Sequence, residues 1–178
     1  MTETVQNGTR SGHVKAPASK SVAHRLLITA ALSQEESTVY CDTMSDDIAA
    51  TMDCLGALGA TFEQGDGFIR VSPVKNRPEG MRELRCKESG STLRFLMPVA
   101  AALGASVTFV MEGKLPKRPH KALTEELSRH NVSVSQEGSL LKLSGSLRPA
   151  IIRFRATFPR NLSRDFCSLC RCFRGTAP

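Results

Sequence analysis

The sequence has no tryptophan, a single tyrosine, and no apolar run close to the roughly 18 residues that a membrane-spanning helix needs. The missing apolar run argues against a membrane protein. The first ten residues are polar, which argues against a secretory signal peptide. Apolar residues still make up 40% of the chain and charged residues 23%, as in ordinary globular proteins. We therefore expect a soluble cytoplasmic protein.

The common signatures of cofactor, metal and nucleophile sites are also absent. There is no glycine-rich phosphate loop, no dinucleotide-binding glycine fingerprint, no nucleophile elbow and no H-E-x-x-H motif. The pair Cys167 and Cys170, with Cys172 nearby, lacks the second ligand pair of a structural zinc site. The four histidines, at 13, 24, 120 and 130, form no recognisable catalytic set. We expect neither a metal ion nor a cofactor.

Charge is distributed unevenly along the 178 residues. The formal net charge is +7, yet residues 1–150 carry 18 basic and 16 acidic side chains. Residues 151–178 carry six arginines and a single acid, Asp165, so the charge composition of the sequence changes near Pro149. A basic nucleic-acid-binding protein with a folded tail is one alternative, and it predicts salt-sensitive binding to DNA or RNA. The nearly balanced charge of 1–150 and the scarcity of aromatic residues weigh against it.

Residues 1–150 alternate between helical and strand-like patterns. Ser19 or Ser21 is a candidate N-cap for the first helix. Ser45 is a candidate N-cap for the second, with Asp46 and Asp47 in the first turn, where the helix dipole favours acids. The expected helices span 21–31, 46–58, 91–103 and 119–130, and the expected strands span 12–15, 37–41, 61–64, 68–71, 84–86, 107–111, 132–135 and 140–143.

The order of these elements recurs along the chain. At an offset of 69 residues, Arg-Leu-Leu at 25–27 matches Arg-Phe-Leu at 94–96, and at an offset of 72 residues 68–71 matches 140–143. The difference falls in an insertion around 116–118. We therefore expect an α/β fold made of two β-α-β-α-β-β units. Such units pack together, because one unit alone cannot bury its apolar faces.

The first candidate site is K-x-P-x-S-K-S-x-x-x-R at 15–25. Lys20 and Ser21 stand at the start of the first helix, and Arg25 follows about one turn later. Backbone N–H groups, a hydroxyl and two cations at one helix N-terminus suit a bound phosphate or carboxylate. The alternative is a capped helix with solvated basic side chains.

Two further candidates lie in the second unit. E-S-G-S-T-L-R at 88–94 precedes a helix, and Gly90 would let a ligand approach the backbone closely. The loop 113–120 carries Lys114, Lys117 and Arg118 together with two prolines that stiffen it, and the planar fork of an arginine suits a phosphate or carboxylate. The alternatives are an ordinary serine cap with a turn glycine, and a solvated basic loop.

Together, K-x-P-x-S-K-S-x-x-x-R, E-S-G-S-T-x-R and K-R-P, in this order on a repeated frame, resemble the EPSP synthase (3-phosphoshikimate 1-carboxyvinyltransferase) family over residues 11–149. Ser45-Asp46-Asp47 before the second helix also fits that family. The related enolpyruvyl transferases that use a UDP-sugar are an alternative, but their lysine is typically followed by asparagine, where this chain has Ser21. The resemblance implies an inside-out α/β barrel of six repeated units, of which this chain has two.

The resemblance also implies a reaction. Family members are monomeric and transfer the enolpyruvyl group of phosphoenolpyruvate to the 5-hydroxyl of shikimate 3-phosphate, releasing phosphate without a metal. By resemblance, Lys20, Ser21 and Arg25 bind shikimate 3-phosphate, while Lys20, Gly90 and Arg118 bind phosphoenolpyruvate. Lys20 and Arg118 would then hold together two anions that otherwise repel each other. The family's acid and base residues lie in a C-terminal part with no counterpart here.

The resemblance divides the chain into three parts. Residues 1–19 correspond to a strand segment of the family's other domain, 20–149 to two units of one domain, and 150–178 to a tail that is out of frame. Family members have a Ser-Ser-Gln segment beyond the position of Pro149. Reading residues 150–178 one base earlier, with suitable wobble bases, gives a string that contains PGNFSSQ at that place. We infer the loss of one base near the Pro149 codon.

We further expect this chain to be inactive by itself, because the third unit and the opposing domain are missing. Apolar helix positions such as Leu93, Leu96 and Val99 should then be partly bare and promote association. An alternative is a fragment that still binds one anionic ligand.

Overall fold

The computed structural model describes residues 8, 11–13 and 19–147. The strand expected over 12–15 lies partly outside them, and its described residues, 12 and 13, are not in a strand. The expectations for residues 1–7 and for the tail 150–178 lie outside the described residues.

The first unit contains two helices and three strands: α1 (Lys20–Ala31), β1 (Ser37–Tyr40), α2 (Asp46–Ala57), β2 (Thr61–Gly65) and β3 (Phe68–Ser72). The three strands form an antiparallel sheet in the order β1-β3-β2, with β2 and β3 joined as a hairpin. These elements confirm the pattern expected for 21–71, with shifts of one or two residues at their ends.

The second unit adds a strand before its first helix and a short 3₁₀ turn, η1. Its elements are β4 (Met81–Lys87), α3 (Gly90–Ala102), β5 (Ser106–Met111), η1 (Leu115–Lys117), α4 (Lys121–Arg129), β6 (Val132–Glu137) and β7 (Leu140–Gly145). The sheet order is β4-β5-β7-β6, with β4 parallel to β5 and the other pairs antiparallel. Strands β5, β7 and β6 therefore repeat the arrangement of β1, β3 and β2. Within the described part of the chain, β1 has no parallel neighbour of the kind that β4 gives to β5.

Helix α4 begins two residues later than the sequence predicts. Arg118 precedes Pro119 and is extended, with φ −74° and ψ 146°, as residues before proline tend to be. His120 follows as the N-cap residue with φ −134°, so the first helical residue is Lys121. The segment 113–120 is therefore a loop with its own 3₁₀ turn rather than the first turn of a helix.

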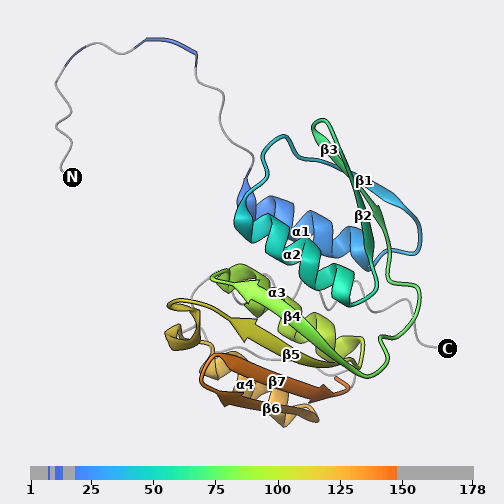
Figure 1. Cartoon of the computed structure of the whole chain (residues 1–178), viewed down its shortest axis with the longest axis vertical. Coiled ribbons are helices and arrows are strands. Elements are labelled where there is room, and N and C mark those ends of the chain that lie inside the picture. The colour runs from blue at the N-terminus through green and yellow to red at the C-terminus, as the bar shows by residue number, and fades with distance from the viewer. Residues whose placement is uncertain (1–7, 9–10, 14–18, 148–178) are drawn as a thin grey trace.

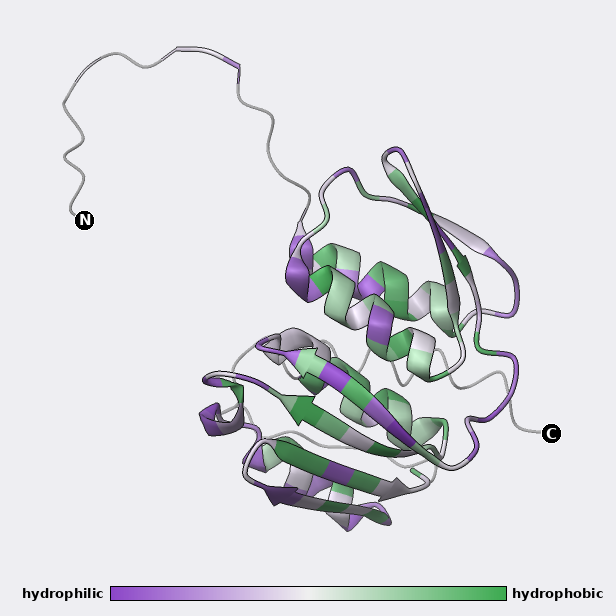
Figure 2. Cartoon of the chain, viewed as in Figure 1, coloured by the Kyte–Doolittle hydropathy of each residue, from purple (hydrophilic) through white to green (hydrophobic). Residues whose placement is uncertain are grey.

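The two units pack through their helices (Figure 1). Helices α1, α2 and α3 contact one another, and α2 also lies against β4 of the second sheet. Each sheet presents one apolar face to these helices, and hydrophobic and hydrophilic residues alternate along β4 (Figure 2). The result is one buried cluster that draws on both units.

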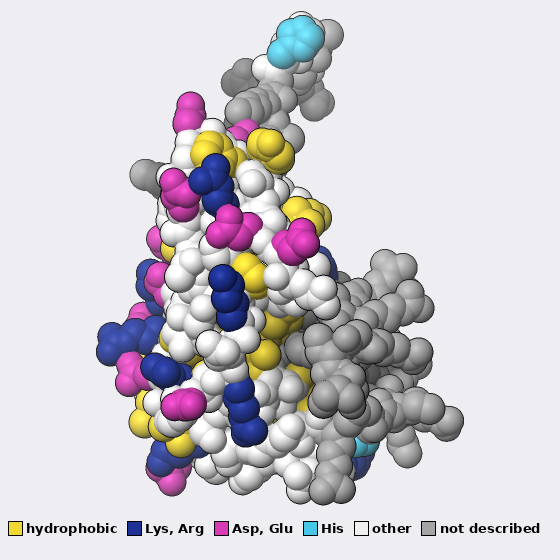
Figure 3. Space-filling model, turned by 90° about the vertical axis from the view of Figure 1, so that its right-hand side faces the viewer, with side chains coloured by type: hydrophobic (Ala, Val, Ile, Leu, Met, Phe, Trp, Pro, Cys, Tyr) yellow, Lys and Arg dark blue, Asp and Glu magenta, His cyan; other side chains and the backbone are white. Residues whose placement is uncertain are grey.

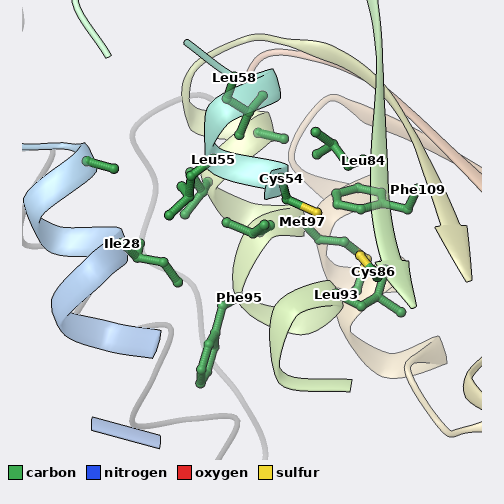
Figure 4. Packing of buried hydrophobic residues seen from close by; sticks show 14 of the residues in the cluster. Ile28, Cys54, Leu55, Leu58, Leu84, Cys86, Leu93, Phe95, Met97 and Phe109 are labelled. Atoms are coloured by element: carbon green, nitrogen blue, oxygen red, sulfur yellow. The ribbon is translucent and has the colours of Figure 1, made fainter. Parts of the chain in front are cut away.

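This shared cluster contains Leu55 of α2, Leu58 at the C-cap of α2, Leu84 and Cys86 of β4, and Phe109 of β5 (Figure 4). All five side chains are at most 1% exposed, so the contact between the two units is shielded from water as well as the interior of each unit.

The expectation that Leu93, Leu96 and Val99 would be partly bare is wrong. Their exposed fractions are 1%, 0% and 0%, because α3 contacts α1 and α2 on one side and β5, β7 and α4 on the other. The exposed apolar positions of the helices lie instead on α1, where Val22 is 51% and Leu26 46% exposed. Any association driven by a bare helix face would therefore involve α1.

Among the described residues, no helix has the length and apolar character needed to cross a bilayer. Basic and acidic side chains are interspersed on the face shown in Figure 3. The described residues on that face thus form no continuous basic surface of the kind that a nucleic acid would need.

Candidate functional site

The first candidate motif lies at the start of α1, beside the start of α2. The Lys20 ammonium forms an ion pair with the carboxylate of Asp47, in the first turn of α2. Arg25, one turn after Ser21, donates from Nη1 to the Ser21 carbonyl at 2.9 Å. Its guanidinium lies 5.4 Å from the centre of the Phe95 ring on α3, a cation–π distance. The structure therefore brings Lys20, Ser21 and Arg25 together and places them against both other helices.

The three helices of this region differ in how they begin. The hydroxyls of Ser45 and Ser89 accept backbone N–H groups of α2 and α3, from Ile48 at 3.4 Å and from Thr92 at 3.3 Å. Ser19 occupies the N-cap position of α1, but its side chain makes no cap hydrogen bond. The expectation of a capping serine is thus confirmed for Ser45 and wrong for the side chain of Ser19. The positive end of the α1 dipole carries no side-chain cap, which favours an anion there.

The second and third motifs meet at Gly90, the first residue of α3. A Cβ at Gly90 would lie 3.1 Å from Nη1 of Arg118 and 3.4 Å from Nη2 of Arg94. Arg94 also donates from Nε to the Gly90 carbonyl at 3.0 Å. Two guanidinium groups therefore converge on the N-terminus of α3, at a position where the backbone carries no side chain. Lys114 and Lys117 of the same loop are exposed and do not approach Gly90 this closely.

Arg94 was assigned no role by the sequence, although it belongs to the second motif. The signal that could have identified it is its spacing, because a residue four positions after Gly90 lies on the same face of the helix one turn later. Arg25 occupies the equivalent position in the first unit, four residues after Ser21, and it likewise donates back to that residue's carbonyl.

The loop that carries Arg118 is held from two sides. Leu115 is buried at 1% exposure and anchors the 3₁₀ turn. The amide oxygen Oε1 of Gln136 on β6 lies 2.7 Å from Nε2 of the His120 ring, and the amide nitrogen donates to the carbonyls of Pro116 and Gly138 at 3.2 Å each. Since that nitrogen donates twice, Oε1 of Gln136 is the acceptor, and Nε2 of His120 donates the proton. These bonds fix the loop on both sides of Arg118.

A chain of buried side chains connects the two clusters. His24 follows Lys20 by one turn on α1 and contacts Thr51 of α2, which contacts Thr92 of α3. Burial lowers the pKa of His24 below its usual value of 6.5, and the nearby cations Lys20 and Arg25 lower it further, while Asp47 opposes the shift. His24 is therefore a neutral imidazole inside the protein at neutral pH.

The candidate site lies at the N-termini of α1, α2 and α3, with Lys20 and Arg118 exposed and Gly90 buried beneath the guanidinium groups. A hollow of about 970 Å³ exists elsewhere, at the C-terminal end of α2, where Gly59, Lys75 and Arg82 are among its lining residues. It belongs to the opposite end of that helix from Asp47. The described residues hold no cluster of three or more histidine, cysteine or acidic side chains that could bind a metal ion.

Comparisons with known proteins agree with these features. A family model described as EPSP synthase (3-phosphoshikimate 1-carboxyvinyltransferase) matches residues 5–158. The 3-phosphoshikimate 1-carboxyvinyltransferase of Clostridium kluyveri is 38% identical over 146 residues, covering 81% of this chain and 34% of the relative. That of Clostridioides difficile is 36% identical over 168 residues, covering 88% and 38%. The chain thus spans little more than a third of the length of these relatives.

The fold gives the same result. An EPSP synthase structure from Acinetobacter baumannii superposes with a TM-score of 0.75 at 19% identity, over 89% of this chain and 38% of that one. An enolpyruvyl transferase from Streptomyces tendae is less similar, with a TM-score of 0.52 over 72% of this chain. The family model accounts for well over half of the sequence, and the fold has the expected repeated units. The chain therefore belongs to the EPSP synthase (3-phosphoshikimate 1-carboxyvinyltransferase) family.

Proposed function

We propose that this chain contributes part of the substrate site of an enzyme that transfers the enolpyruvyl group of phosphoenolpyruvate to the 5-hydroxyl of shikimate 3-phosphate, with release of phosphate. The observation that carries the proposal is the convergence of Arg94 and Arg118 on Gly90 at the start of α3. Two guanidinium groups at a helix N-terminus suit a small ligand with both a carboxylate and a phosphate.

In this proposal the two clusters bind different substrates. Lys20, Ser21 and Arg25 bind shikimate 3-phosphate, whose phosphate lies over the start of α1, where Ser19 provides no side-chain cap. Gly90 and Arg118 bind phosphoenolpyruvate together with Lys20, and Arg94 adds a second guanidinium. The cations offset the repulsion between the two anions, so that the hydroxyl and the enol carbon can be held close to each other.

No acid or base for the chemical step is assigned to this chain. We propose that residues 20–149 form two units of one domain, that 1–19 belong to the other domain, and that the whole enzyme is a cytoplasmic monomer that uses neither metal nor cofactor. The chain by itself then binds substrate without turning it over. Phosphate release from a mixture of both substrates by the purified chain would contradict this part of the proposal.

Titration calorimetry with each substrate separately tests the binding roles. We expect Arg118→Ala to weaken binding of phosphoenolpyruvate about tenfold or more, since a charge-assisted hydrogen bond to an anion contributes ~1.5–3 kcal/mol. Lys117→Ala is the matched control, because Lys117 is an exposed cation of the same loop. Equal losses in both variants would indicate a diffuse charge effect and refute the assignment of Arg118.

A further inference from the structure

A continuous line of buried polar groups crosses the contact between the two units. Nδ1 of His24 lies 2.7 Å from Oγ1 of Thr51, which lies 2.7 Å from Oγ1 of Thr92, which lies 2.7 Å from Oγ of Ser89. All four residues have an exposed fraction of 0%. Three short hydrogen bonds in series, away from water, form a network whose members polarise and constrain one another.

The four members of this network lie in the first two turns of α1, α2 and α3 or, for Ser89, at the N-cap of α3. His24 lies one turn after Lys20 on α1, Thr51 follows Asp47 by one turn on α2, and Ser89 is the N-cap of α3. Thr92 makes a further contact, at 3.4 Å, with the carbonyl of Asp47. The network therefore connects the helix start that carries Lys20 and Ser21 to the one that carries Gly90.

The direction of the hydrogen bonds follows from counting protons. The Thr92 hydroxyl donates to Ser89, and its alternative acceptor, the Asp47 carbonyl, also lies away from Thr51. Thr51 must then donate to Thr92 and accept from His24, so the imidazole carries its proton on Nδ1. This leaves Nε2 of His24 as a bare lone pair, and that atom is buried without a partner among the described residues.

The bare nitrogen is informative because a buried polar atom without a partner costs about 1–3 kcal/mol. An apolar side chain at position 24 would avoid that cost. The Thr51 hydroxyl, however, would then lose its donor inside the core. The imidazole of His24 therefore lowers the stability of the fold through Nε2 while it provides the hydrogen bond from Nδ1 to Thr51. A buried polar group that costs stability calls for a functional explanation.

We propose that His24, Thr51 and Thr92 are positioning residues, which hold the N-termini of α1 and α3 in one fixed arrangement. The cluster at the start of α1 and the cluster at Gly90 then lie side by side, and Lys20 can face the anions bound at both. The inference rests on the proposed function. None of the three side chains touches a substrate; each acts by placing a helix start that does. Anion sites formed by backbone N–H groups depend on such placement, because shifts of a fraction of an ångström weaken several hydrogen bonds at once.

The test uses the chain with Thr51 replaced in two ways. Thr51→Val keeps the shape and removes the hydroxyl, which cuts the network in the middle, and Thr51→Ser restores the hydroxyl. Thr29→Val, at an exposed position of α1, is the matched control. We expect Thr51→Val to shift the amide NMR signals of both Lys20 and Gly90 in the ligand-free chain. We also expect it to weaken binding of phosphoenolpyruvate and of shikimate 3-phosphate about tenfold each. Thr51→Ser should restore both properties.

A second measurement needs no variant. Long-range proton–nitrogen spectra of the unaltered chain report which imidazole nitrogen is protonated, and we expect His24 to be neutral with its proton on Nδ1. A proton on Nε2, or a charged ring at pH 7, would overturn the proposal. So would a Thr51→Val variant that folds and leaves the Gly90 signal and both affinities unchanged. If the unaltered chain binds neither substrate, the proposed function fails, while the NMR signals and the tautomer still decide whether the network joins the two helix starts.

Discussion

Replacing Gly90 with alanine should weaken ligand binding at the start of α3 without lowering the stability of the fold. The new methyl group would lie 3.1 Å from Nη1 of Arg118, 3.4 Å from Nη2 of Arg94 and 3.7 Å from a methyl of Leu115. The 3.1 Å distance is shorter than an ordinary van der Waals contact, but the Arg118 guanidinium is the end of a flexible side chain and can move by a few tenths of an ångström. The methyl group therefore displaces Arg118 and occupies the space next to the backbone that a ligand would use.

The expected magnitudes follow from this geometry. Gly90 is not in the left-handed region, so alanine suits its backbone, and the folded state should be unchanged or up to about 1 kcal/mol more stable. Binding of phosphoenolpyruvate should weaken about tenfold, a cost of ~1.4 kcal/mol in binding free energy. Binding of shikimate 3-phosphate should change little, because its proposed contacts lie on α1.

Calorimetry gives the two dissociation constants, and urea unfolding gives the stability. Gly56→Ala is the matched control, because Gly56 lies in α2 with nothing within 4 Å of an added Cβ. It should gain about 0.5–1 kcal/mol of stability and leave both affinities unchanged. If Gly90→Ala binds phosphoenolpyruvate as tightly as the unaltered chain, Gly90 does not adjoin the ligand and the reasoning is wrong.

Three other predictions concern pH, the arginine loop and the gene. Because burial lowers the pKa of His24 in the folded state, the free energy of unfolding should fall as the pH drops below 6.5, where the unfolded chain binds a proton that the folded chain does not. Urea unfolding at several pH values measures this, and the absence of any decline would contradict it. Gln136→Ala removes two hydrogen bonds to the loop, at Pro116 and His120, and should weaken phosphoenolpyruvate binding several-fold through Arg118. Gln64→Ala, at an exposed glutamine of β2, should leave that binding unchanged, and calorimetry compares the two variants. Resequencing the gene should show PGNFSSQ encoded in the neighbouring frame after the codon for Pro149, and the frameshift inference fails if it does not.

Much of the fold follows from local patterns in the sequence. The spacing of apolar residues in α1 and the acids after Ser45 in α2 predict these helices to within about a residue, because capping and periodicity are local effects. The start of α4 is predicted two residues too early, because Pro119 suits either a helix start or a preceding loop. The non-helical backbone of His120 decides between them.

The exposure of the helices was harder to predict. Leu93, Leu96 and Val99 were expected to need the missing third unit, yet the second sheet and the neighbouring helices cover them. The spacing of apolar residues shows that a helix has an apolar face to bury, but it does not show which neighbouring element will cover that face. Only the packing of α3 between α1, α2 and its own sheet settles the question.

The sequence motifs predict several residues of the candidate site, but they do not predict the contacts between helices that hold these residues in place. Gly90 and Arg118 could be proposed from their motifs, whereas the second guanidinium of Arg94 depends on the turn of α3. The contacts of Thr51 with His24 and with Thr92 join residues 27 and 41 positions apart. No periodic pattern connects such positions, and hydroxyl and imidazole groups are common in soluble proteins for other reasons.

The ion pair between Lys20 and Asp47 means that an anion binding to Lys20 competes with a carboxylate of the protein itself. The carboxylate neutralises the lysine when no substrate is present, so an incoming anion must displace it. The pair is half exposed on the lysine side, and such pairs contribute about 1 kcal/mol or less. A singly charged anion such as chloride gains little more from Lys20 than Asp47 already provides. We expect a phosphate ester with two charges, which could also accept hydrogen bonds from the start of α1, to gain more and so to replace the carboxylate. We therefore expect the carboxylate to favour highly charged ligands over singly charged ones, by about 1 kcal/mol or less.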